Sequence, residues 1–143
     1  MKRRLAMVAV AIGLTATVGA VVTAQAADML VEIYRIAPGQ HANFLKLIAL
    51  YDQASKEAGL APRQLYVHQD GASWDFLIIQ PASVTPEQSR ALDAALKRLG
   101  APQGAKFFLE IRSYMAEHSD TFAEGPTTAA DWLNKLNPQQ SPP

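Results

Sequence analysis

The chain has 143 residues, of which 49% are apolar, and its 13 basic residues equal its 13 acidic residues in number. This balance, without clusters of Lys and Arg in the body of the chain, excludes the basic surface that nucleic-acid binding requires, so we expect no nucleic-acid partner. Cysteine is absent, which excludes disulfides, thiolate metal ligands and a thiol nucleophile.

The first 26 residues have the pattern of a secretory signal peptide. Lys2, Arg3 and Arg4 precede an uncharged run that is rich in Ala and Val, and the run ends in Ala24-Gln25-Ala26. Small residues at this spacing are typical of a cleavage site, so the pattern predicts cleavage before Ala27 and a periplasmic or secreted protein. The alternative is an uncleaved anchor, because about 20 apolar residues can span a bilayer.

Cleavage changes the charge of the chain. All 13 acidic residues follow the predicted cleavage point, whereas three of the 13 basic residues precede it, which leaves an excess of three negative charges. The remaining residues are enough for one hydrophobic core, so we expect a single domain over residues 27–137. The last six residues, PQQSPP at 138–143, are polar and proline-rich and predict a disordered tail. We expect no stable membrane insertion of the cleaved chain.

The first predicted elements are a strand and a helix. Met29 to Ile36 alternates in part and is rich in β-branched and aromatic residues, which is typical of a strand. From Gln40 to Ala58 the apolar residues recur at helical spacing, and Gly59 follows where a left-handed C-terminal cap is expected.

A hairpin and a second helix are predicted next. The strand-like runs Arg63–Gln69 and Ser73–Gln80 flank Asp70-Gly71-Ala72, which is typical of a tight turn. Thr85, followed by Pro86 and by Gln88 three residues later, predicts a capped helix that ends near Leu99.

Residues 107–122 fit two templates. A helix places Phe107, Ile111, His118 and Phe122 on one stripe and covers more of the residues, whereas a strand explains only the alternation around Leu109 to Arg112. We therefore predict a helix that ends at Gly125-Pro126. Thr127 or Thr128 then caps a last helix over residues 129–136, whose buried side is predicted to hold three residues: Trp132, Leu133 and Leu136.

The segments VEIYRIAPGQHANFLKLI and LYVHQDGASWDFLII, in this order, resemble the dimeric α+β barrel proteins of the ferredoxin-like superfold, including NIPSNAP-like and antibiotic-biosynthesis-monooxygenase-like domains. The resemblance covers about Met29 to Leu99. It implies a domain that pairs with a second copy through its sheet and encloses a pocket between sheet and helices. A helical 107–122 departs from the βαββαβ order of the family, so the predicted fold is α+β with a ferredoxin-like βαββα core and additional C-terminal helices.

The stretch HSDTFAEGPTTAADWL contains the first candidate for chemistry. His118 and Asp120 diverge by about 200° on a helix, so they do not share a metal ion there. Two interpretations of this stretch remain. In the structural one, His118 and Phe122 anchor a helix-turn-helix corner against the core. In the functional one, the neutral imidazole opens on a pocket and acts as a base or ligand.

Further candidates lie on the hairpin. Tyr66, His68 and Asp70 form a polar row, which is typical of either a site or a solvent-facing sheet surface. Asp75 lies among apolar neighbours and needs a partner, for which Arg35 or Arg112 is expected. One face of the same strand is predicted to be core or dimer interface, and it holds Trp74, Phe76 and Ile78.

Together these features predict a homodimeric module that binds a small hydrophobic ligand or has a structural role, without a cofactor or a metal ion. The alternative is a cofactor-free enzyme of the monooxygenase or isomerase type that acts on a small hydrophobic substrate. The sequence identifies no catalytic set. The candidate ligand-binding residues are His118, as a base, and three orienting groups, Tyr34, Tyr66 and Arg112. His68 of the hairpin is a further candidate.

The signal pattern generates the first testable prediction. The protein produced by an exporting bacterium should begin at Ala27 and be released by osmotic shock, because a peptidase cleaves after Ala26. N-terminal sequencing of the released protein checks this. Recovery of a chain that begins at Met1 from the membrane fraction would show that the segment is an anchor.

Overall fold

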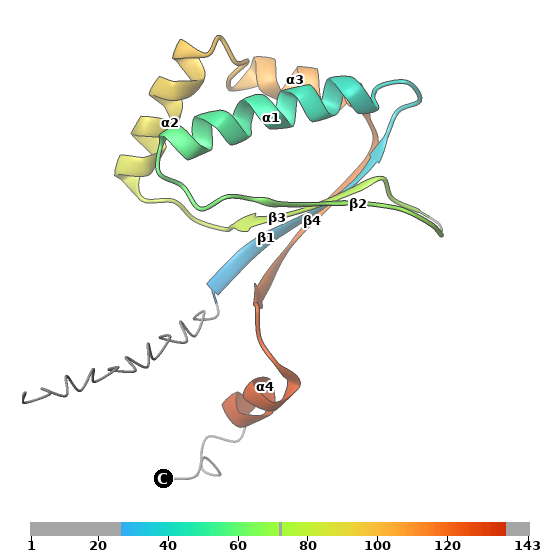
Figure 1. The fold of residues 1–143 in the computed structure, drawn as a ribbon, viewed down its shortest axis with the longest axis vertical. Coiled ribbons are helices and arrows are strands. Elements are labelled where there is room, and N and C mark those ends of the chain that lie inside the picture. The colour runs from blue at the N-terminus through green and yellow to red at the C-terminus, as the bar shows by residue number, and fades with distance from the viewer. Residues whose placement is uncertain (1–26, 72, 137–143) are drawn as a thin grey trace, which may run out of the picture.

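The computed structural model describes residues 27–71 and 73–136, so the predicted signal peptide and the predicted tail lie outside the described residues. Four strands and four helices follow one another along this described part of the chain (Figure 1). Their bounds are β1 Ala27–Ile36, α1 His41–Glu57, β2 Gln64–Val67, β3 Phe76–Pro81, α2 Pro86–Arg98, α3 Ala105–Tyr114, β4 Met115–Gly125 and α4 Ala129–Leu136.

The four strands form one antiparallel sheet in the order β2-β3-β1-β4. Helices α1, α2 and α3 cover one face of this sheet (Figure 1). The βαββαβ order of the strands and of the helices α1 and α2 confirms the predicted α+β class with a ferredoxin-like core. The layers also define two faces, which we name the helix-covered face and the open face.

Alternation along β1 and β3 decides which residues form the core. Side chains two residues apart on a strand point to the same face. Tyr34 and Ile36 on β1 and Phe76 and Ile78 on β3 are buried on the helix-covered face, against Phe44 of α1. The Phe44 ring stacks on Phe76 at a centroid distance of 5.4 Å and is tilted against Tyr34 at 4.8 Å. Phe76 and Ile78, which were predicted to be core or dimer interface, are therefore core.

The predicted helix over residues 107–122 is correct only as far as Tyr114. From Met115 the chain becomes β4, which pairs with β1 from Ala27↔Gly125 to Ile36↔Met115. The pairing supplies partners for the backbone N–H and C=O groups along one side of β1, and a helix at these residues would leave that edge of the strand unpaired. The fourth strand of the βαββαβ order is therefore present beside the first.

The C-terminal corner also differs from the prediction. It joins a strand to a helix, and Phe122, which was expected to anchor it in the core, is 73% exposed. The bounds of α4 match the predicted helix, and the Thr128 hydroxyl accepts a hydrogen bond from the Asp131 N–H at 3.1 Å, as a cap. The predicted buried side is wrong, because three residues of α4 are exposed: Trp132, Leu133 and Leu136.

The hairpin is confirmed, with strands shorter than predicted. β2 pairs with β3, and the loop between them spans residues 68–75. The Asp70 carboxylate accepts the Gly71 N–H at 2.8 Å, and Gly71 has φ 107°, which a glycine adopts without strain. Asp75 pairs with neither Arg35 nor Arg112. Its carboxylate instead accepts the Ile36 N–H at 2.7 Å and lies 3.3 Å from His41 Nε2.

The predicted caps of the first two helices are confirmed. Gly59 follows α1 with φ 69°. At α2 the Thr85 hydroxyl accepts the Gln88 N–H at 3.1 Å, and the Gln88 side chain accepts the Thr85 N–H at 3.0 Å, which completes a capping box. Within the described ranges 27–71 and 73–136, no helix has both the length and the apolar character needed to cross a bilayer.

Two cap variants distinguish a helix that is part of the core from one that is not. Thr85→Ala should lower the free energy of unfolding by about 1 kcal/mol, because α2 packs on α1 through buried residues. Thr128→Ala should fray α4 without lowering the melting temperature of the domain, because no residue of α4 is buried. Thermal denaturation and hydrogen exchange of the α4 amides check this pair. A similar fall in melting temperature for both variants would mean that α4 unfolds together with the core.

Candidate functional site

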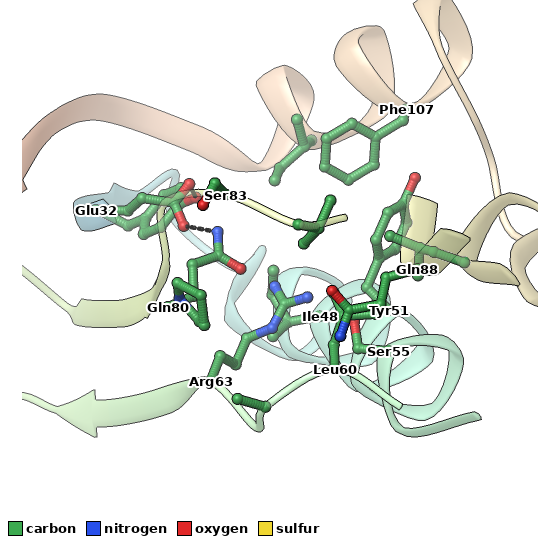
Figure 2. A pocket seen from close by; sticks show the side chains of 16 residues that line it. Glu32, Ile48, Tyr51, Ser55, Leu60, Arg63, Gln80, Ser83, Gln88 and Phe107 are labelled. Carbon is green, nitrogen blue, oxygen red and sulfur yellow. Dashed lines mark hydrogen bonds between the residues drawn. The ribbon is translucent and has the colours of Figure 1, made fainter. Parts of the chain in front are cut away.

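A pocket of about 400 Å³ lies between the helix-covered face of the sheet and the helices (Figure 2). β1 and β3 form its floor. Side chains from α1, α2 and α3, from the loop before β2 and from the loop after β3 complete its walls. Its volume falls within the range of about 300–1,000 Å³ that is typical of small-molecule sites. Polar groups are concentrated at two positions in it, around Glu32 and around Arg63.

At the first position, Glu32 is held by two neutral donors. Its side chain is only 14% exposed, because it shares the face of Tyr34 on β1. The Tyr34 hydroxyl donates to Glu32 Oε1 at 2.7 Å, and Gln80 Nε2 donates to Glu32 Oε2 at 2.7 Å. These two donors offset part of the desolvation cost of a carboxylate in a largely apolar environment.

The environment of Tyr34 keeps its hydroxyl protonated. Burial, followed by the charge of Glu32 and the hydrogen bond to it, raises the pKa of Tyr34 far above its ordinary value near 10. The hydroxyl is therefore a donor to the carboxylate and is poorly suited to act as an acid at neutral pH. The Tyr34 ring also stacks on His118, with centroids 4.5 Å apart.

At the second position, Arg63 lies between β2 and the end of α1. Its side chain is 12% exposed, and its Nε lies 2.6 Å from Asp52 Oδ1. Figure 2 shows the guanidinium extending toward the interior of the pocket. Burial raises the pKa of Asp52, and the positive charge of Arg63 opposes that rise. The pocket therefore has a guanidinium at one position and a carboxylate at the other.

The rest of the wall is mainly apolar. The Tyr51 hydroxyl, also at the wall, is occupied by a 2.5 Å hydrogen bond to the Pro102 carbonyl. The remaining polar side chains are those of Ser55, Ser83 and Gln88, and the Gln88 amide donates to the Gly59 carbonyl at 3.3 Å. The apolar side chains come from all three helices and from the loops: Ile48, Leu60, Val84, Leu92, Phe107 and Ile111.

Two of the five candidates from the sequence come together at this site. Tyr34 lines the pocket. His118 lies behind Tyr34 on β4, with its Nε2 3.9 Å from Glu32 Oε1. His118 is thus a neighbour of the Glu32 group and lines a separate hollow with Arg112.

The other three candidates lie apart from the pocket. The Arg112 guanidinium sits over the Phe108 ring, 5.2 Å from its centroid. Tyr66 is on the open face of the sheet, and its hydroxyl donates to the Gln64 side chain at 2.9 Å. The His68 ring lies 4.9 Å from the Trp74 ring in the loop between β2 and β3. The structure therefore brings the predicted base His118 next to two of its predicted orienting groups, Tyr34 and Arg112, and leaves Tyr66 apart.

At the two polar positions of the pocket, the residues that the sequence analysis missed are Glu32, Gln80 and Arg63. A signal for the first two was present, since Glu32 shares its strand face with Tyr34, and Gln80 shares its face with Ile78. A polar residue on the buried face of a strand is a candidate for a site. The sequence contains no comparable signal for Arg63, because its position at the pocket depends on the path of the loop between α1 and β2.

Metal binding has no support from the residues at 27–71 and 73–136. No three His, Cys, Asp or Glu side chains among them come together as ligands of one ion. The carboxylate of Glu32 is already occupied by Tyr34 and Gln80.

No model of a known protein family matches the sequence, and no curated relative is similar to it. Solved structures with a similar fold include two of one protein from Agrobacterium tumefaciens, described as a NIPSNAP family protein with unknown function. They are 14% and 15% identical to this chain, cover 71% and 73% of it with 95% and 92% of their own length, and superpose with TM-scores of 0.46 and 0.44. An uncharacterized NIPSNAP domain protein from Burkholderia xenovorans is 18% identical, covers 71% of this chain with 96% of its own and has a TM-score of 0.41.

The environment of Tyr34 generates a pH prediction. Because its pKa is higher in the folded chain than in the unfolded chain, its contribution to stability is complete below about pH 10 and is lost as the pH rises toward the folded pKa. Relative to Tyr34→Phe, the unmutated protein should therefore lose stability above pH 10. Urea denaturation of both proteins at pH 8 and pH 11 checks this. An unchanged difference in stability between the two pH values would contradict the assigned environment.

Proposed function

We propose that this protein is an exported homodimer that binds a small molecule in the pocket between its sheet and its helices. The observation that supports binding most directly is the composition of the pocket. An apolar wall with a few polar groups in fixed positions is the usual design of a small-molecule site, in which the apolar surface supplies affinity and the polar groups supply orientation.

The open face of the sheet supports a dimer. The residues of β1 and β3 that alternate with the buried ones point away from the helices, and they are mainly apolar. The apolar ones are Met29, Val31, Ile33, Leu77 and Ile79, each half-buried, and the charged one is Arg35. None of the helices within residues 27–71 and 73–136 covers this apolar face, which favours its burial against a partner. A second copy fits this face because the resemblance to dimeric α+β barrels implies pairing through the sheet.

Export rests on the N-terminal pattern of a basic start, an apolar run and Ala-Gln-Ala. The absence of cysteine in the whole chain means that the exported domain depends on its core for stability.

The alternative function is a cofactor-free enzyme that acts on a small hydrophobic substrate in the same pocket. The hydrogen bond between Tyr34 and Glu32 favours it, because a carboxylate beside a phenol can move a proton. Two observations favour binding instead. Both oxygens of the Glu32 carboxylate are already engaged by the Tyr34 hydroxyl and the Gln80 amide, and burial keeps Tyr34 protonated.

Native mass spectrometry tests binding and dimer formation in one measurement. The protein as the cell produces it should give the mass of two chains with a retained small molecule, which denaturing conditions release. Val84→Trp should abolish the retained mass and leave the dimer intact, because Val84 lines the pocket and is 43% exposed. Val67→Trp is the matched control, since Val67 is 52% exposed and does not line the pocket.

Leu77→Asp tests the other half of the proposal. A charge on the open face should give a monomer that still retains the small molecule, because the pocket lies on the opposite face of the sheet. If native mass spectrometry gave the mass of one chain for the unmutated protein, the proposed dimer would be wrong. If Val67→Trp and Val84→Trp lost the retained molecule equally, or the unmutated protein retained and bound none, binding in this pocket would be wrong.

A further inference from the structure

We propose that the ligand is a monocarboxylic acid with an apolar body, and that the guanidinium of Arg63 binds its carboxylate. The inference rests on the proposed function, since it assigns a chemical class to the ligand of the same pocket. It makes Arg63 the residue that determines specificity.

Arg63 has donors to spare. A guanidinium has five N–H groups, and Asp52 lies next to the Nε of Arg63. Among the described residues, neither Nη group of Arg63 makes a hydrogen bond to the protein. Every fully buried polar side-chain atom in this part of the chain has a hydrogen-bond partner. Because the Nη groups have none, they are not fully buried and remain accessible to a ligand. Two parallel N–H groups on a planar guanidinium match the two oxygens of a carboxylate.

Among anionic ligands, the surrounding charges favour one that has a single negative charge. Asp52 already offsets the charge of Arg63, so a dianion such as a phosphate monoester would bring excess negative charge into a largely desolvated site. Glu32 lines the same pocket and would repel a second carboxylate. A dicarboxylate is therefore disfavoured as well.

The apolar wall determines the rest of the ligand. Leu60 lies beside Arg63, and Phe107 of α3 lies across the pocket (Figure 2). Ile111 of α3 also lines the pocket. An aliphatic or aromatic body in contact with these side chains would remove apolar surface from water on both partners. A small hydrophilic acid would gain only the contact with Arg63.

The test compares three probes of equal chain length by isothermal titration calorimetry at pH 7.5. The probes are octanoate, octanol and octylamine, and the protein is the purified form that the cell produces, freed of any retained ligand. Octanoate should bind about tenfold more tightly than octanol, since hydrogen bonds between charged groups are the stronger ones. Octylamine should bind most weakly, because its charge is that of Arg63.

Three variants assign the preference to Arg63. Arg63→Gln should reduce the affinity for octanoate to that for octanol and leave the affinity for octanol unchanged. Arg112→Gln removes the same charge outside the pocket and should change neither affinity. Asp52→Asn keeps the guanidinium and removes the competing carboxylate, so it should tighten octanoate binding by up to about fivefold. Asp52→Asn also tests the proposal if Arg63→Gln does not fold.

The outcomes separate this inference from the proposed function. Equal affinities for octanoate and octanol, or the tightest binding for octylamine, would overturn the role of Arg63 and leave the pocket as a binding site. If Arg112→Gln weakened octanoate binding as much as Arg63→Gln, the preference would be due to net charge. That result would also overturn the role of Arg63. Failure of all three probes to bind would contradict both the inference and the proposed pocket.

Discussion

The central position of β1 is the constraint on which the rest of the structure depends. β1 pairs with β3 on one side and with β4 on the other, so its residues cannot rotate or slip without breaking two ladders. Every second residue of β1 is therefore held beneath the helices. This alternation buries Tyr34 and Ile36 in the core, and it also places the carboxylate of Glu32 on the same face.

A carboxylate beneath helices has consequences for its neighbours. Because desolvation disfavours the charged form, Glu32 requires donors, and the structure supplies them from Tyr34 on the same strand and from Gln80 on β3. Each of these donors is oriented by the regular strand that holds it. The polar group at this end of the pocket is therefore rigid, and rigid polar groups are what a binding site needs to discriminate between ligands.

The other end of the pocket is built differently. Arg63 comes from the segment that joins α1 to β2, and its partner Asp52 comes from α1. The two ends thus depend on different elements, and the apolar wall between them comes from the helices. The arrangement places opposite charges apart in one cavity. It also explains why no local stretch of the sequence contains the site, including HSDTFAEGPTTAADWL, of which only His118 contacts it, through Tyr34.

The sequence by itself determined the local features. The alternation in MLVEIYRI, the glycine after α1, the turn at Asp70-Gly71 and the capping box at Thr85 each predicted a strand, a helix end, a hairpin or a helix start that the structure confirms. Each of these features is decided within a few residues, by backbone sterics or by a local hydrogen bond.

Only the tertiary structure decided the rest. Met115–Gly125 is a strand because β1, about 90 residues earlier in the chain, offers it an unpaired edge, and the spacing of Met115, His118 and Phe122 fits a helix equally well. The same holds for the site. Glu32, Gln80 and Arg63 are far apart in the sequence, and what makes them one pocket is the order of the strands in the sheet and the packing of the helices on it. Such contacts depend on the closure of long loops in the chain, for which a local pattern contains no signal.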